Sequence, residues 1–232
     1  AGVRLGDAKT GKWGFIDKDG NVVLEPQWGY VLDFSEGLAG FSDLDYDPWS
    51  GGQWGFIDKA GNVVIEMKFG GVSSFGEGLA SFTKGTIAAG KWGIMDKKGK
   101  VVLDPTWGGI APFSEGLASV STGEMFDDNA KGGFIDRSGN PVVEPIWDNS
   151  TDFSEGLAAV NKKDGPIDQW GFIDKHGTIV ISPSWRRVQS FQEGMAAVVE
   201  GVRWGFIDAT GSIIIPAQWE EVSKFSNGLS VV

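Results

Sequence analysis

The chain is a tandem repeat, and this feature constrains its fold more than any other. The pentapeptide WGFID, or a variant of it, starts six units, at Trp13, Trp54, Trp92, Gly132, Trp170 and Trp204. A second aromatic residue follows at a constant distance, at Trp28, Phe69, Trp107, Trp147, Trp185 and Trp219. A phenylalanine then follows at Phe34, Phe75, Phe113, Phe153, Phe191 and Phe225. All variation in length lies in the connection after this phenylalanine, so each unit has a constant frame and one variable connection.

Each frame predicts short β-strands. In the first unit, Trp13–Asp17 and Val22–Glu25 are aromatic and β-branched, and the KDGN between them is a turn signal, so they predict a hairpin. The apolar residues Trp28, Val31 and Phe34 predict a short inner strand. The following SEGLAGF predicts another strand, entered through a glycine that can take a positive φ. No unit has ten residues of helical periodicity, so we expect an all-β fold.

Four strands in about 40 residues are typical of a β-propeller blade. The sequence therefore predicts a six-bladed β-propeller, with residues 1–232 as a single repeat domain and units starting near 13, 54, 92, 132, 170 and 204. The first residues, AGVR, and the last, GLSVV, both align with the strand after EGL, so residues 1–12 are expected to complete a terminal blade. Because both ends supply the same strand position, an open β-solenoid of stacked hairpins stays an alternative.

The run KWGFIDKDGNVVLEPQW, followed by V-x-x-FSEGLA, resembles the WG (KWG) repeat family, which forms tandem arrays in mostly bacterial proteins. The resemblance extends from about Trp13 to the end of the chain. The chain departs from the pattern at Gly132, where the tryptophan is missing, and at Asn227, where other units have glutamate. The resemblance implies a binding or interaction scaffold and supplies no catalytic motif to transfer.

Residues that recur in every unit are expected to be structural, because a catalytic role would create six active sites. The aspartate of WGFID is expected to cap the turn that follows it, and the glutamate of EGLA to do the same at its own turn. The repeated tryptophans are expected to form the core between blades. The segment Asp17-Lys-Asp19-Gly20-Asn21 is similar to the start of a calcium loop, but the other units do not keep Asp19, so we expect a hairpin turn. His176 lies in the same turn and is a poor general base.

Charge and composition exclude several classes of function. The chain has 20 Lys and Arg against 31 Asp and Glu, a net charge of −11, which argues against a nucleic-acid partner. It has no apolar run long enough for membrane insertion, and its first residues do not have the pattern of a retained signal peptide. The absence of Cys removes thiol catalysis and cysteine zinc sites. We expect neither a cofactor nor a metal.

Residues that break the repeat are the candidates for ligand binding. The first variable connection is the longest and contains Trp49, the only tryptophan outside the repeat positions. With Tyr46 and three alternating acids it is suited to stack on a sugar or a peptide side chain, to gather Ca²⁺, or to pack on the adjacent blade. The predicted ligand-binding residues are Trp49, Tyr46, Asp43, Asp45, Asp47, Phe126, Arg186 and Arg187.

Two functions of different class follow. The favoured one is a non-catalytic scaffold that binds a protein or peptide, or less readily a glycan, through its variable loops. The alternative is a carbohydrate-active propeller enzyme with acidic residues lining a central funnel. The funnel residues are expected on the inner strands, at Asp33, Asp148, Asp152, Arg186, Arg187, Glu220 and Glu221. The scaffold is favoured because no particular pair of carboxylates stands out.

Overall fold

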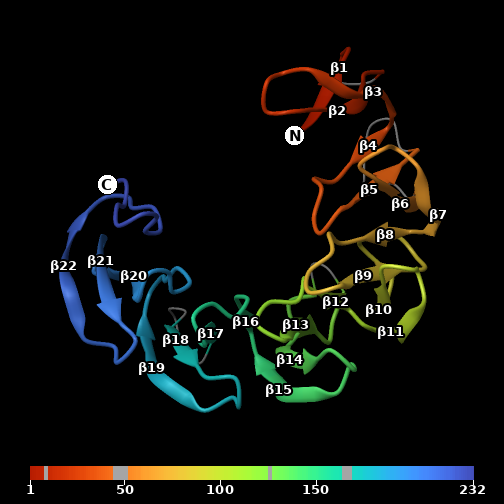
Figure 1. Cartoon of the computed structure of the whole chain (residues 1–232). Coiled ribbons are helices and arrows are strands. Elements are labelled where there is room, and N and C mark those ends of the chain that lie inside the picture. The colour runs from red at the N-terminus through yellow and green to blue at the C-terminus, as the bar shows by residue number, and fades with distance from the viewer. Residues whose placement is uncertain (8–9, 44–51, 125–126, 164–168) are drawn as a thin grey trace. The chain divides into compact units, whose positions relative to one another are not determined.

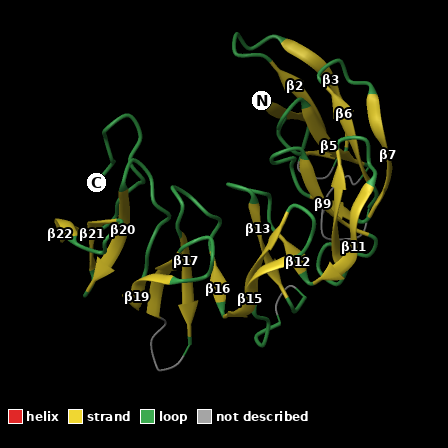
Figure 2. Ribbon diagram, turned by 60° about the horizontal axis from the view of Figure 1, so that its bottom comes forward, coloured by secondary structure: helices red, strands yellow, loops and turns green. Residues whose placement is uncertain are grey.

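The computed structural model describes residues 1–7, 10–43, 52–124, 127–163 and 169–232. In these ranges all regular structure is β, in six antiparallel sheets, and Figure 2 shows strands joined by loops and turns. No helix long and apolar enough to cross a membrane occurs in the described ranges. The all-β class with six repeat units is thus confirmed.

The chain divides into two compact units, residues 1–113 with 122–128 and residues 114–121 with 129–232. The contacts described below each lie within one unit. The single repeat domain, and its completion by residues 1–12, stay predictions.

The second sheet shows how each sheet is built. It contains β4 (Tyr30–Val31), β5 (Leu38–Ser42), β6 (Trp54–Asp58) and β7 (Val63–Phe69) in that order, and we call these positions A to D (Figure 1). Tyr30 lies opposite Ser42, Ser42 opposite Trp54, and Trp54 opposite Phe69. These four residues therefore form a row at one end of the sheet. We call it the loop end, because the variable connection leaves there, and the opposite end the hairpin end.

The remaining strands occupy the same four positions. Position A also holds β8 (Gly71–Val72), β12 (Gly109–Ile110) and β16 (Asn149–Ser150). Position B holds β1 (Gly2–Leu5), β9 (Leu79–Thr83), β13 (Leu117–Ser121), β17 (Ala158–Lys162) and β20 (Met195–Glu200). Position C holds β2 (Lys12–Ile16), β10 (Trp92–Asp96), β14 (Gly132–Asp136), β18 (Gln169–Ile173) and β21 (Arg203–Asp208). Position D holds β3 (Val22–Trp28), β11 (Val101–Trp107), β15 (Pro141–Trp147), β19 (Ile179–Trp185) and β22 (Ile213–Trp219).

The boundaries of the sheets differ from those of the sequence repeats. Strands A and B of a sheet come from one repeat, and strands C and D come from the next, as Trp54 at the start of the second repeat shows. The first sheet (β1-β2-β3) and the last (β20-β21-β22) have three strands each. In the last sheet, an isolated bridge between Val188 and Val198 stands at position A. At the C-terminus the Ser223 N–H donates to the Val231 carbonyl at 2.8 Å, as an A segment does to the B strand of its own sheet.

A steric restriction explains why the second residue of the WG motif is glycine. A register shift in every C–D hairpin brings strand D close to this glycine. A Cβ atom on Gly55 would lie 2.5 Å from the carbonyl oxygen of Ile65 and 2.9 Å from the nitrogen of Met67, which no side chain tolerates. The same clash, at 2.4–2.6 Å, exists at Gly14, Gly93, Gly133, Gly171 and Gly205.

The A–B turns at the hairpin end have two consecutive residues with positive φ. Glu36 has φ 51° and Gly37 has φ 92°, the combination of a two-residue type I′ turn. Ser35 and Leu38 close this turn with two backbone hydrogen bonds of 2.9 and 3.1 Å. The positive φ of the glycine agrees with the sequence prediction, whereas the positive φ of the glutamate was not predicted.

Within each unit, the core lies between consecutive sheets. Phe172 and Ile181 of the fifth sheet pack with Val198 and Ile207 of the sixth. The phenylalanine of WGFID meets the later phenylalanine of its own repeat across this space, as in the pair Phe172 and Phe191, whose ring centroids are 4.8 Å apart. The prediction that repeated tryptophans are core is confirmed for Trp54 and Trp147, 2% and 3% exposed. The other eight are half-buried.

Candidate functional site

The loop end of the fifth and sixth sheets contains a pocket of about 470 Å³. Strand β19 contributes Trp185, which is followed by Arg186, and the end of strand β20 contributes Val199 and Glu200. The other lining residues are Gln169, Ser184 and Gly201. A volume of this size accommodates one or two amino-acid side chains or a small ligand. All of these residues lie in the second compact unit.

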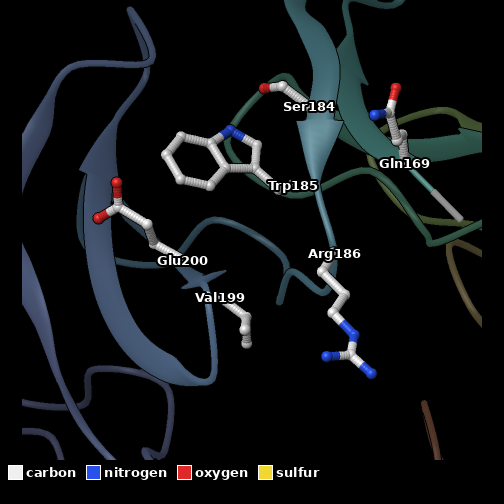
Figure 3. Close-up of a pocket in the computed structure, with 7 residues that line it drawn as sticks. Gln169, Ser184, Trp185, Arg186, Val199 and Glu200 are labelled. Atoms are coloured by element: carbon white, nitrogen blue, oxygen red, sulfur yellow. The ribbon is translucent and has the colours of Figure 1, made fainter. Parts of the chain in front are cut away.

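Trp185 and Glu200 make the centre of this site. Figure 3 shows the indole of Trp185 and the carboxylate of Glu200 pointing toward one another, whereas the guanidinium of Arg186 points away from both. Trp185 is half-buried, and the two charged residues are exposed. Among the described residues, neither the Arg186 guanidinium nor the Glu200 carboxylate has an ion-pair or hydrogen-bond partner. The pocket therefore presents one aromatic surface and two uncompensated charges of opposite sign.

Arg203, which lies opposite Glu200 in the β20–β21 pair, already has an ion-pair partner. Arg203, at the start of β21, holds Glu220 with an N–O distance of 3.1 Å. Both side chains are exposed, so the pair contributes little to stability. It does, however, leave Glu200 without its closest cationic neighbour in the chain.

The equivalent place one sheet earlier is filled by the protein itself. By repeat position, Trp147 corresponds to Trp185, and Lys162 corresponds to Glu200. The ammonium of Lys162 lies 5.4 Å from the centroid of the Trp147 ring, within the range of a cation–π contact. Two repeats with the same backbone geometry thus differ: one has a lysine cation over its tryptophan, and the next has a pocket beside its tryptophan.

One buried polar atom beside the pocket belongs to the repeat and not to the site. The indole Nε1 of Trp185 is buried and has no hydrogen-bond partner in the described structure. The Nε1 atoms of Trp147, at the same repeat position, and of Trp54 are in the same state. This feature therefore does not distinguish the pocket from the rest of the array.

Only part of the predicted site can be placed. Arg186 lines the pocket, whereas the side chain of Arg187 does not, although its carbonyl accepts the Val199 N–H at 2.9 Å. Asp43 is exposed and accepts the N–H of Gln53 at 3.2 Å. The remaining predicted residues, Trp49, Tyr46, Asp45, Asp47 and Phe126, lie outside the described residues.

Of the seven residues that line the pocket, sequence reasoning predicted only Arg186, and it missed the two at the centre. Trp185 was assigned to the core because it recurs, and Glu200 was not considered because it lies in the shortest variable connection. A signal for Glu200 was available, because a position occupied by Lys162 in one repeat changes the sign of its charge in the next.

The recurring aspartates cap their turns as predicted. Asp58 accepts the N–H groups of Ala60 and Asn62 at 2.9 Å each, and the Asn62 amide at 3.0 Å. The hydrogen bond from the Asn62 side chain, followed by that from its backbone, holds the pKa of Asp58 below its ordinary value. The hairpin turn predicted at Asp17 is confirmed, because its carboxylate accepts the N–H groups of Asp19 and Asn21.

The prediction that each glutamate caps its own turn is wrong. Glu155 accepts the N–H groups of Glu193 and Gly194, at 2.7 and 2.9 Å, in the turn of the next sheet. The reason is that the residues flanking its own turn, Ser154 and Leu157, already bond to each other. The N–H groups left free are those of the two positive-φ residues, and the glutamate of the preceding sheet reaches them. Glu36, Glu115 and Glu193 accept N–H groups of the next A–B turn in the same way, and we call each of these contacts a clasp.

Lysines strengthen two of these clasps. Lys175 lies 3.1 Å from the carboxylate of Glu115 and also donates to its carbonyl at 2.9 Å. Burial raises the pKa of Glu115, but the hydrogen bonds from Lys175 and the Gly156 N–H outweigh it and hold the pKa below its ordinary value. Lys97 holds Glu36 in the same way at 3.0 Å. These carboxylates are engaged in structure and are not free for acid–base chemistry.

Of the carboxylates predicted for a catalytic funnel, Asp148 has the most complete surroundings. It accepts hydrogen bonds from the Lys131 ammonium and, at 2.7 Å, from the Lys163 N–H. The Lys131 hydrogen bond is the main reason that the pKa of Asp148 is lowered. A general acid in glycoside hydrolysis needs the opposite shift. Of the funnel candidates, Asp152 has a shift in that direction, because partial burial raises its pKa.

Comparison with known proteins agrees with the repeat architecture. The family described as WG containing repeat matches residues 13–43, 54–86, 92–125, 133–165, 170–201 and 204–232. A comparison with curated proteins gives no match. Each family match begins at a C strand, and the first five end after the following B strand, which is the offset between repeat and sheet described above.

Two solved structures show a similar fold at low sequence identity. One is a crystal structure of the eukaryotic initiation factor, with a TM-score of 0.58 and 9% identity over 95% of this chain and 64% of that chain. The other, from a study of two prolyl endopeptidases, has a TM-score of 0.54 and 12% identity over 92% of this chain and 41% of that chain. The chain thus spans less than two thirds of either protein. At these identities the likeness concerns the fold alone, and it supports the β-propeller class.

The missing tryptophan at Gly132 does not disturb this assignment. Gly132 still lies opposite Trp147 in the β14–β15 pair, with the register shift that the other units have. Six matches to one family cover most of the chain, and each coincides with a structural repeat. The chain therefore belongs to the family of WG-repeat proteins.

Proposed function

We propose that this protein is a non-catalytic repeat scaffold that binds a protein or peptide at the loop end of its sheets. One observation carries the proposal: the pocket at Trp185 combines a half-buried indole with two charged side chains that have no partner among the described residues. Tryptophan and arginine are enriched among the residues that dominate protein interfaces. A glycan is the less favoured ligand, since opposite charges beside an aromatic ring suit a peptide better.

The surrounding structure supports a binding role. The pocket is built on the ends of strands β19 and β20, whose interiors are packed between sheets, so its residues are held in place before a ligand arrives. The residues that differ between repeats gather at this same loop end, whereas the hairpin end repeats its turns almost unchanged. Variation at one end of a constant frame is typical of a recognition surface.

The first variable connection remains part of the proposal on sequence grounds. Trp49 and Tyr46, with Asp43, Asp45 and Asp47, are proposed as a second contact region, and Phe126 as a contact from the third connection. Asp43 starts the first of these connections at the loop end of its sheet. A partner that contacts several loops would gain affinity from each.

The test is selection from a random peptide library on the immobilised protein, with an array of glycans as a second arm. Selected peptides are expected to bind the double variant Arg186→Ala with Glu200→Ala at least tenfold more weakly than the parent. Its melting temperature should not change, because both side chains are exposed. The control is Glu144→Ala, an exposed acid on strand β15 away from the pocket. Failure to select any peptide, or selection of glycans alone, would refute the proposal.

A further inference from the structure

The repeat offers a direct comparison between two tryptophans in equivalent surroundings. Trp147 ends the D strand of the fourth sheet, and Trp185 ends that of the fifth. In each case the last residue of the next B strand lies beside the ring: Lys162 beside Trp147, and Glu200 beside Trp185. The two places therefore have the same backbone framework and differ in the charge supplied.

At the first of these tryptophans the protein supplies its own cation. The Lys162 ammonium is 5.4 Å from the centre of the indole, where the negative face of the ring attracts a positive charge. Trp147 is only 3% exposed. The geometry of this repeat thus accommodates an ammonium group over the tryptophan at this position.

At the second tryptophan the cation is missing and an acid stands in its place. Glu200 has no partner among the residues that the structure describes, and a pocket of about 470 Å³ lies between it and Trp185. An aromatic face beside an unpaired carboxylate attracts a cation through two interactions, a cation–π contact with the ring and an ion pair with the carboxylate. The carboxylate would also repel an anionic ligand from the indole.

The position of Arg186 and the net charge of the whole chain also favour a cationic ligand. Arg186 also lines the pocket, but Figure 3 shows its guanidinium pointing away from the indole and the carboxylate, so it does not occupy the place of the missing lysine. The whole chain has 31 acidic residues against 20 basic ones, so a basic partner is attracted at long range as well.

From these observations we propose that the pocket binds a lysine or arginine side chain of a protein partner, with its cation over the Trp185 indole and paired with Glu200. This rests on the proposed function and names the chemistry of the residue that the scaffold recognises. The partner's side chain takes the place that Lys162 has beside Trp147.

The first test uses the selected peptides. They are expected to contain lysine or arginine, and replacing that residue by norleucine, which keeps the length but removes the charge, should weaken binding at least tenfold. Peptides that bind without a basic residue, or equally well with norleucine, would overturn this inference and leave the binding scaffold standing. A preference for acidic peptides, lost in Arg186→Gln, would also overturn it.

The second test does not depend on the library. N-acetyl-lysine N-methylamide is titrated into the ¹⁵N-labelled protein while the indole N–H signal of Trp185 is followed, with its norleucine analogue as the control ligand. A saturable shift is expected for the lysine compound alone. No saturable shift would overturn the inference, whatever the library gives.

Two variants of one residue make the test specific. Glu200→Lys introduces a lysine at the position that Lys162 occupies in the preceding repeat. The new side chain should fill the site and weaken binding of the lysine compound at least tenfold. Glu200→Gln should weaken it about fivefold, through loss of the ion pair alone. Glu144→Gln, which removes the same charge from an exposed site on β15, should change binding less than twofold. Equal effects of Glu144→Gln and Glu200→Gln would show a general charge effect and overturn the proposal.

Discussion

Two adjacent glycines of strand β14 give the sharpest test of the fold. A Cβ atom on Gly133 would lie 2.5 Å from the carbonyl oxygen of Val143 and 2.8 Å from the nitrogen of Pro145. On Gly132 the nearest atom would be the Ser150 hydroxyl at 3.3 Å. Neither glycine has a positive φ, so alanine is not strained by its own backbone at either site. The two positions differ only in the space available to a methyl group.

The expected effects are therefore opposite. Gly133→Ala forces strand β15 away from β14, and because backbone cannot move as a side chain does, we expect a loss of about 3 kcal/mol or more in the free energy of unfolding. Gly132→Ala should be neutral or stabilising by up to about 0.5 kcal/mol, since alanine is favoured over glycine in a strand. For a chain of this size, about 3 kcal/mol corresponds to a fall of roughly 6–12 °C in melting temperature.

Differential scanning calorimetry and urea unfolding of the two variants measure this difference directly. Gly132→Ala is the matched control, because it makes the same chemical change one residue away in the same strand. The reasoning is refuted if Gly133→Ala melts within about 2 °C of the parent, or if both variants lose the same stability.

Three further predictions follow from the packing and the turns. Trp54→Ala should cost about 3–5 kcal/mol in urea unfolding, because this indole is 2% exposed, and Trp92→Ala should cost less because it is half-buried; equal losses would contradict the packing described. The pKa of Asp58 and Asp174 is lowered by hydrogen bonds to the folded turn, so the stability they contribute is present above the unfolded pKa near 3.8 and is lost as the pH falls through the folded value. The double variant Asp58→Asn with Asp174→Asn should therefore show a shallower fall of melting temperature between pH 4 and pH 2 (roughly the range set by lowered carboxyl pKa values), and an unchanged slope would speak against the capping role. Glu155→Ala should lower the free energy of unfolding by about 1 kcal/mol, since two N–H groups lose a charged acceptor, whereas Glu144→Ala should have no effect.

The constant frame of the repeat was sufficient to predict most strands. The hairpin of β2 and β3 follows from aromatic and β-branched residues on both sides of a turn signal, because local sequence determines both strands and the turn between them. The A strands are only two residues long, and so short a segment has no periodicity to detect. The positive φ of Glu36 was missed because glutamate is not expected in that conformation, which only the type I′ turn imposes.

The glutamate contacts between sheets and the pocket could not be predicted from local sequence patterns. Glu155 bonds residues 38 and 39 positions further along the chain, and which N–H groups are free there depends on turns that only the folded sheets define. The pocket depends on which side chain stands beside Trp185, and repetition of that tryptophan concealed its local difference. A comparison of repeat positions for changes of charge, as between Lys162 and Glu200, would have identified the site from the sequence.

The offset between repeat and sheet bears on how such an array changes in evolution. Every B strand is followed along the chain by a C strand of the next repeat, so inserting or deleting one whole repeat leaves each internal sheet with all its strands. Each sheet is then a hybrid of two neighbouring repeats, and a newly joined pair must match across the B–C ladder, as Val160 does with Gly171 and Ala159 with Phe172. Recombination can thus alter the number of sheets in a single event, but the fit of each new junction has to be selected afterwards.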